Sequence, residues 1–229
     1  MSLNAAIGRA QAYGFFSTVF LYPLENWTED LSTFAKILPE LALEPWSLSL
    51  EPWSLSALQS EHLRVFGLTG SLCYETEYGL PHEFRQSQEL ADIAGFYHAF
   101  GFRLGGAVRE RPDHLAAELE FMHLLALKEA YALQSGIGEH IEVCVEAQRK
   151  FLADHLGRWL GWFAEGLGRL AEDSVYTTLA RLAAALAQSE AARLGVPLQP
   201  QRLVEIKATP LAPDLACGEC PLLERPEKE

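Results

Sequence analysis

"RPDHLAAELEFMHLLALKEA", Arg111–Ala130, is a run of strong helix formers that begins with a proline and an aspartate. Pro112 suits the first turn of a helix, where a missing N–H costs no hydrogen bond. Asp113 beside it places a negative charge near the positive end of the helix dipole. The residues that follow are apolar on most sides, which is typical of a buried helix. The stretch therefore predicts a long, mostly buried helix over Asp113–Gln134.

Helical periodicity continues along the rest of the chain, with breaks at glycines and prolines and no convincing alternating strand. The predicted helices span Leu3–Leu21, Glu25–Leu38, Ser54–Phe66, Gln86–Phe102, Asp113–Gln134, Glu139–Leu156, Gly157–Glu172 and Ser174–Leu194. Helices with short connections favour an all-α, single-domain helical bundle of about eight helices over residues 1–195. Six prolines from Pro197 to Pro226 predict a Pro-rich, partly extended C-terminal tail over residues 196–229.

The charge and the cysteine content narrow the classes of partner. The chain has 31 acidic and 18 basic residues and a formal net charge of −13, so its surface repels nucleic-acid phosphates and anionic lipids. Its four cysteines do not form the pattern of a disulfide framework, which favours a reducing cytoplasm. The apolar stretch Ala12–Leu24 is shorter than the roughly 20 residues of a membrane-spanning helix, and we interpret it as part of a buried first helix. The sequence predicts a cytoplasmic protein with no nucleic-acid partner and no stable membrane insertion.

Two short motifs interrupt the helical pattern. "LEPWSLS" occurs twice in succession, at residues 43–49 and 50–56. A seven-residue repeat cannot build a solenoid, whose units have about 20 residues or more, so we interpret it as a loop insertion. Exposed aromatic contacts through Trp46 and Trp53 are the alternative. The lone "CGEC" at Cys217–Cys220 lacks the second pair of a zinc ribbon, and we interpret it as a solvated or loosely docked segment.

The histidines and glutamates of the predicted long helix raise the question of a metal site. His114 and Glu118 share one face, whereas His123 lies roughly on the opposite side, nine residues from His114. Because no H-E-x-x-H pair is present, a metal would need ligands from other segments. A carboxylate such as Glu118 on an apolar helix is costly unless it is paired, which leaves a structural network and a cation site as alternatives. A metal-dependent helical-bundle enzyme using His114, Glu118 and Glu129 is the alternative function.

The loop before the predicted helix Gln86–Phe102 is rich in aromatic and acidic residues. Such a composition suits a ligand that is both apolar and cationic. The residues of this kind that we single out are Tyr74, Glu75, Glu77, Tyr78 and Phe84. The chain carries neither a G-x-S-x-G elbow nor a P-loop, so the sequence gives little support to nucleophilic or nucleotide chemistry.

These segments resemble the TorD/DmsD/NarJ-type chaperones that mature molybdenum enzymes of the dimethyl sulfoxide reductase family. The signature of that family is similar to "ERPDH", Glu110–His114, followed by a glutamate-bearing apolar helix. The resemblance is strongest to the branch that serves the type II enzymes. It runs through "YETEYG" (Tyr74–Gly79), "QSQELADIAGFY" (Gln86–Tyr97), "ERPDHLAAELEFMHLLALKEAYAL" (Glu110–Leu133), "FLADHLGRWL" (Phe151–Leu160) and "CGECPL" (Cys217–Leu222).

The resemblance implies an all-helical protein without catalytic residues that binds the twin-arginine signal peptide of an unfinished catalytic subunit. It implies that the chaperone holds this subunit until molybdopterin guanine dinucleotide is inserted, and that it binds no cofactor stably itself. A basic segment followed by an apolar one suits a groove with acids beside aromatics and leucines. A structural subunit that stays in the mature complex is the remaining alternative. The expected binding residues are Pro112, Asp113, His114 and Glu118, with Tyr74, Glu75, Glu77, Tyr78 and Phe84 on a neighbouring surface.

Overall fold

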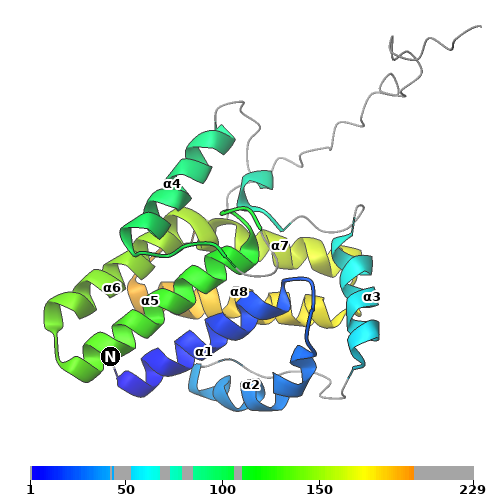
Figure 1. The fold of residues 1–229 in the computed structure, drawn as a ribbon, viewed down its shortest axis with the longest axis horizontal. Coiled ribbons are helices and arrows are strands. Elements are labelled where there is room, and N and C mark those ends of the chain that lie inside the picture. The colour runs from blue at the N-terminus through cyan, green and yellow to red at the C-terminus, as the bar shows by residue number, and fades with distance from the viewer. Residues whose placement is uncertain are drawn as a thin grey trace, which may run out of the picture.

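The computed structural model describes residues 2–41, 43, 53–67, 73–78, 85–105 and 110–198. Within these ranges the chain forms α-helices with short 3-10 and π turns, and its β-type pairing is one isolated bridge, between Tyr74 and His114 (Figure 1). The α-helices are α1 (Leu3–Val19), α2 (Leu31–Ile37), α3 (Leu55–Phe66), α4 (Arg85–Ala99), α5 (Leu115–Ser135), α6 (Gly138–Phe151), α7 (Gly157–Leu170) and α8 (Val175–Leu194). The prediction of an all-α, single-domain helical bundle is confirmed.

Three predicted features lie outside the described residues. They are most of the "LEPWSLS" duplicate (residues 44–52), Phe84, and the tail beyond Leu198 with its "CGEC" motif. Of the duplicate, Trp53 and Ser54 are described just before α3. The Ser54 side chain accepts a hydrogen bond from the Ala57 amide and so caps that helix.

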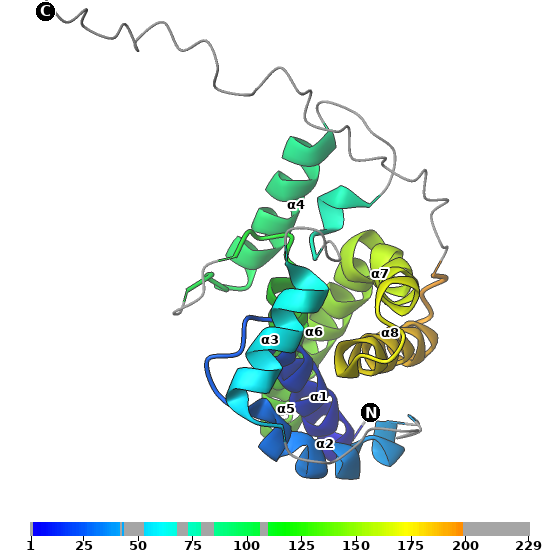
Figure 2. The same ribbon diagram turned by 90° about the vertical axis from the view of Figure 1, so that its right-hand side faces the viewer.

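Helices α1 and α5 pack along one another (Figures 1 and 2). A side chain at position 14 would lie 2.9 Å from the His123 ring, so Gly14 permits the close approach of the two helices. The His123 Nδ1–H donates to the carbonyl oxygen of Ala10 at 2.7 Å, which places His123 against α1, on the opposite side of α5 from His114 as predicted. Tyr13 and Phe16 are fully buried, as expected for an apolar first helix. Among the described helices, none is both long and apolar enough to cross a membrane.

A buried ionic network joins four helices of the bundle. Arg9 of α1 pairs with Glu129 of α5 at 2.7 Å and with Glu190 of α8 at 3.2 Å. Gln148 of α6 donates to the second oxygen of Glu129 at 2.8 Å. Arg193 pairs with Glu190 at 2.8 Å, so two guanidinium groups face two carboxylates. The charges therefore balance inside the bundle, and Glu129 is committed to this network.

Two predicted helices have different ends in the structure. The predicted helix Glu25–Leu38 begins instead with a 3-10 turn at Trp27–Asp30, followed by α2. The Asn26 side chain accepts from the amide of Thr28 at 3.3 Å and so fixes this later start. The predicted helix Gln86–Phe102 ends three residues early, at Ala99. Gly101 has φ +70°, a left-handed conformation that glycine adopts without strain and that ends the helix.

The predicted boundary between Leu156 and Gly157 is confirmed as the start of α7, and a π turn rather than a loop precedes it. Helices α6 and α7 are joined through a π turn over Leu152–Leu156, so the helical path continues past Gly157. A side chain at Gly157 would collide with the carbonyl oxygen of Leu152, which explains the glycine at this position. The π turn also carries His155, which is 2% exposed. Single π turns recur at functional sites, because they redirect one side chain.

The ionic network gives a testable prediction for stability. Arg9→Leu leaves Glu129 and Glu190 buried with only Arg193 to balance them. We expect a loss of roughly 3–5 kcal/mol in the free energy of unfolding in urea, because a buried carboxylate without its partner is costly. Arg149→Ala, which removes an exposed ion pair with Glu146 within α6, is the matched control and should change little. A similarly small loss for both variants would contradict the role of Arg9.

Candidate functional site

The start of α5 is joined to the loop at residues 73–78, which precedes it by almost 40 residues. The Leu115 amide donates to the Cys73 carbonyl at 2.8 Å, and the Glu75 amide donates to the Asp113 carbonyl at 2.8 Å. These two bonds flank the isolated bridge between Tyr74 and His114. The structure thus brings together the two segments that the sequence analysis singled out separately.

Asp113 is the centre of this junction. Its carboxylate is fully buried and accepts from the Thr76 amide (3.3 Å) and hydroxyl (2.7 Å), and from Arg111 Nε (3.0 Å) and Nη2 (2.7 Å). The Arg111 guanidinium also lies 4.5 Å from the centre of the Tyr74 ring, within cation–π range. Asp113, one of the expected binding residues, is therefore buried and does not reach the accessible surface. A carboxylate carries enough acceptor sites for all these donors, and they take it out of water.

His114 caps α5, which begins at Leu115 rather than at Asp113. Its Nδ1 accepts from the Ala116 amide at 3.1 Å, so this nitrogen carries no proton. The ring is 5% exposed and stands edge-on to the Tyr74 ring, with centroids 5.1 Å apart. Burial lowers the pKa of His114, while the nearby Glu110 and Asp113 act in the opposite direction. A capping histidine of this kind has no free Nδ1 for a metal.

Glu118 lies one turn further along α5 and is also fully buried. Its Oε2 accepts from the indole Nε1–H of Trp159 at 3.1 Å. Burial raises the pKa of Glu118 well above its usual value, and the negative charge of Glu75 raises it further. Oε1 of Glu118 has no hydrogen-bond partner among the described residues. Of the two alternatives left open by the sequence, the Trp159 bond favours a structural network.

Glu75 and His155 extend this buried cluster toward α4. Glu75 is 3% exposed, and its Oε2 lies 3.2 Å from Nδ1 of His155. Nε2 of His155 lies 3.3 Å from Oδ2 of Asp92 on α4. The Tyr97 hydroxyl of α4 donates to the carbonyl of Pro112 at 2.7 Å. The loop, the π turn and α4 are thus tied to the start of α5.

The accessible surface of the site consists of other residues. Among the predicted residues, Tyr74, Glu77, Tyr78 and Pro112 are partly exposed, whereas Glu75, Asp113, His114 and Glu118 are buried. Phe84 lies outside the described residues. The partly exposed residues that the prediction missed are Thr76, Glu110 and Arg111. We call the group formed by Tyr74, Glu77, Tyr78, Glu110 and Arg111 the motif surface.

Glu110 and Glu77 give the motif surface its acidity. Glu110 Oε2 accepts from the Tyr74 hydroxyl at 2.8 Å. Glu77 Oε2 is buried, and no donor within the described ranges reaches it. Burial also raises the pKa of Glu77, although Arg111 opposes the shift. An oxygen buried without a donor is costly, so this position favours a ligand that brings an N–H group.

The metal-enzyme alternative is not supported by the geometry. Glu129 lies 15 residues after His114, which is about 22 Å along a helix, and it is paired with Arg9. Within the described ranges, no group of three histidine, cysteine, aspartate or glutamate side chains could hold a metal ion. His114, Glu118 and Glu129 are therefore not brought together.

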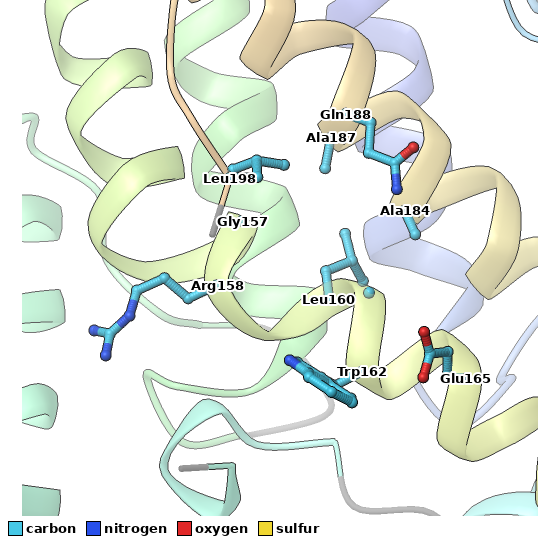
Figure 3. Close-up of a pocket in the computed structure, with 10 residues that line it drawn as sticks. Gly157, Arg158, Leu160, Trp162, Glu165, Ala184, Ala187, Gln188 and Leu198 are labelled. Carbon is cyan, nitrogen blue, oxygen red and sulfur yellow. The ribbon is translucent and has the colours of Figure 1, made fainter. Parts of the chain in front are cut away.

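A separate cleft of about 580 Å³ lies between α7 and α8 (Figure 3). Gly157, Gly161, Ala184 and Ala187 line it, and Leu198 enters it at one end. Its charged groups are Arg158 and Glu165, and no set of acid, base and nucleophile converges there. The cleft is an apolar surface rather than a site for chemistry.

Comparison with known proteins gives the family. The model of the family described as "Nitrate reductase delta subunit" matches residues 25–165, more than half of the chain. The chain belongs to this family. The matched part contains the loop at residues 73–78, the start of α5 and the π turn, so the whole motif surface lies within the family region.

Curated relatives of this family member carry more specific names. The chlorate reductase assembly chaperone protein of Ideonella dechloratans is 28% identical over 200 residues, 86% of this chain and 94% of the relative. The selenate reductase assembly chaperone protein of Thauera selenatis is 29% identical over 199 residues, 84% and 95% of the two chains. The dimethyl sulfide dehydrogenase assembly chaperone protein of Rhodovulum sulfidophilum is 36% identical over 135 residues, 56% and 53%. The predicted resemblance to the TorD/DmsD/NarJ-type chaperones is confirmed.

Two of the residues that build the site, His155 and Trp159, were not among the expected binding residues. Both lie in "FLADHLGRWL", Phe151–Leu160, one of the blocks that carry the family resemblance. The inward direction of His155 depends on the π turn, which helical periodicity does not reveal. Trp159 stands among apolar residues in the sequence, so nothing there indicates that its indole N–H donates to Glu118.

Asp113→Asn tests whether the junction is structural. The amide nitrogen of asparagine would face the donors of Arg111 and Thr76, so we expect the free energy of unfolding to fall by roughly 2 kcal/mol. Urea denaturation measures this, with Asp173→Asn, whose side chain is 91% exposed, as the control. Unchanged stability for Asp113→Asn would show that the network contributes nothing to the fold.

Glu118 predicts a dependence of stability on pH. The folded state raises the pKa of Glu118 and so binds its proton more tightly than the unfolded state. The stability from this group is complete below the unfolded value of 4.5 and is lost as the pH rises toward the raised folded pKa. Glu118→Gln mimics the protonated form and should flatten the fall in unfolding free energy as the pH rises above 4.5. Glu120→Gln, at an exposed position of the same helix, should retain the wild-type slope, and equal slopes for both variants would contradict the assignment.

Proposed function

We propose that the chain is a cytoplasmic, system-specific assembly chaperone for a molybdopterin enzyme. It binds the twin-arginine signal peptide or the apo catalytic subunit of a type II dimethyl sulfoxide reductase family enzyme. It holds this client for insertion of molybdopterin guanine dinucleotide before export, and it binds no cofactor stably itself. Family membership and the relatives named as assembly chaperones support the general role, which is that of a chaperone and not of an enzyme.

The motif surface carries the specific part of the proposal. A twin-arginine leader is a basic segment followed by an apolar one. Glu77 and Glu110 stand beside the rings of Tyr74 and Tyr78, so the surface offers acids next to aromatics. A guanidinium group would supply the donor that the buried Glu77 oxygen lacks. This is the single observation on which the choice of a basic ligand rests.

Charge supports the same ligand at longer range. The net charge of −13 attracts a cationic segment and speeds its encounter with the surface. The positive charge of Arg111 within the motif surface is offset by the buried Asp113 carboxylate, with which it pairs at 2.7 Å. In this proposal the buried residues Asp113 and His114 fix the shape of the motif surface through their contacts with the loop at residues 73–78. The carbonyl group of Pro112 holds α4 in place by accepting a hydrogen bond from the Tyr97 hydroxyl.

Calorimetric titration of the full chain with twin-arginine leader peptides of molybdoenzymes from its own source tests the proposal. We expect one leader to bind, and Glu77→Gln or Glu110→Gln to weaken that binding by about tenfold, because each removes a carboxylate from the guanidinium. Replacing both arginines of the leader by lysines should weaken binding as well, since lysine cannot form the bidentate contact.

Glu139→Gln, at an exposed position in the first turn of α6, is the matched control and should leave the affinity unchanged. If neither Glu77→Gln nor Glu110→Gln weakens binding of the leader, the leader does not bind at the motif surface. The absence of binding to every leader peptide would overturn the function.

A further inference from the structure

A second surface lies on the α5–α6 hairpin, away from the motif surface. A cleft of about 390 Å³ runs between the two helices, with Phe100 from the end of α4 in its lining. Its other main lining residues are Leu127, Lys128 and Tyr131 of α5 and His140 and Val143 of α6. Tyr131 lies 17 residues after His114, which is about 25 Å along the helix axis. We call this surface the hairpin cleft.

The hairpin cleft gathers large apolar side chains in contact with solvent. Tyr131 is 68% exposed, Val143 51% and Leu127 43%. Ile137, 39% exposed, lies in the connection between α5 and α6, and the other exposed large hydrophobic residues of the described part lie on α1, α3, α7 and other connecting segments. Single exposed hydrophobic residues need no explanation, whereas a group that lines one concave surface marks an interaction site.

The charge of the hairpin cleft differs from that of the chain as a whole. Its ionisable lining consists of Lys128, His140, the phenol of Tyr131 and the thiol of Cys144, and it contains no carboxylate, although the chain has 31 acidic residues. An occupant with apolar side chains and a carboxylate complements this lining, and a basic leader does not. A second copy is disfavoured, because a two-fold interface would place the same patch, with its Lys128, against itself.

We infer that the hairpin cleft binds an apolar, carboxylate-bearing helix from the mature part of the client catalytic subunit. The inference rests on the proposed function for the identity of the client. Leu127 and Tyr131 are four residues apart on α5 and so form one ridge, while Val143 faces them from α6. A third helix laid into this groove buries all three side chains and brings its carboxylate to Lys128. The chaperone then holds its client at two places, the leader at the motif surface and the mature chain at the hairpin cleft.

Photo-cross-linking in the source cells tests the occupant directly. The variant Tyr131→p-benzoylphenylalanine should cross-link to peptides from the mature region of a molybdoenzyme catalytic subunit. The matched control is Leu170→p-benzoylphenylalanine at the end of α7, also an exposed hydrophobic position at 49%, and it should not give this product. Cross-links to a second copy of the chain, to the leader alone, or to nothing would each overturn the inference.

Calorimetry separates this inference from the proposed function. Tyr131→Ala should weaken binding of the leaderless apo catalytic subunit by about tenfold, as expected for a central tyrosine, and leave the affinity for the leader peptide unchanged. If Tyr131→Ala weakens leader binding, the hairpin cleft is part of the leader site and is not a second surface. If the wild-type chain binds no leader, the proposed function fails, while the cross-linking result still decides what occupies the cleft.

Discussion

The buried carboxylate of Asp113 is the interaction on which the site depends. It accepts from the backbone and side chain of Thr76 and from Arg111, and so holds the loop at residues 73–78 against the start of α5. Removing a carboxylate from water is unfavourable unless such donors replace the water. The same contacts fix where Tyr74, Glu77 and Tyr78 stand. A residue without solvent contact therefore determines the shape of the accessible surface.

Much of the fold could be predicted from the sequence, because it follows from local periodicity. The long helix after Pro112, the buried face of α1 and the placement of His123 opposite His114 all depend on helical geometry within one segment. The predicted helix ends are wrong where a capping side chain or a glycine stops the helix although the hydrophobic periodicity continues. Asn26 delays the helix that follows it, and Gly101 ends α4 early. The π turn before Gly157 has no periodic signal, so the continuous path from α6 into α7 could not be foreseen.

The site was harder to predict than the fold, because burial depends on partners distant in sequence. Spacing placed His114 and Glu118 on one face of a helix, but it could not show that Glu118 meets Trp159, 41 residues further on. Nor could it show that His155 would contact Glu75, 80 residues earlier. Asp113 and Glu118 were expected to bind the client, whereas the structure buries both carboxyl groups against partners within the fold. Of the two partly exposed acidic residues of the motif surface, Glu77 was among the residues expected from the sequence, whereas Glu110 was not.

The buried cluster and the motif surface are mechanically connected through Trp159. One face of its indole packs against the ring of Tyr78, with centroids 5.2 Å apart, and its N–H donates to Glu118. Glu75, whose negative charge raises the pKa of Glu118, contacts His155, and His155 Nε2 lies 3.3 Å from Asp92 of α4. A continuous chain of contacts thus runs from Tyr78 on the motif surface through the buried cluster to α4, so the loop, the π turn and α4 are packed against the same group of side chains.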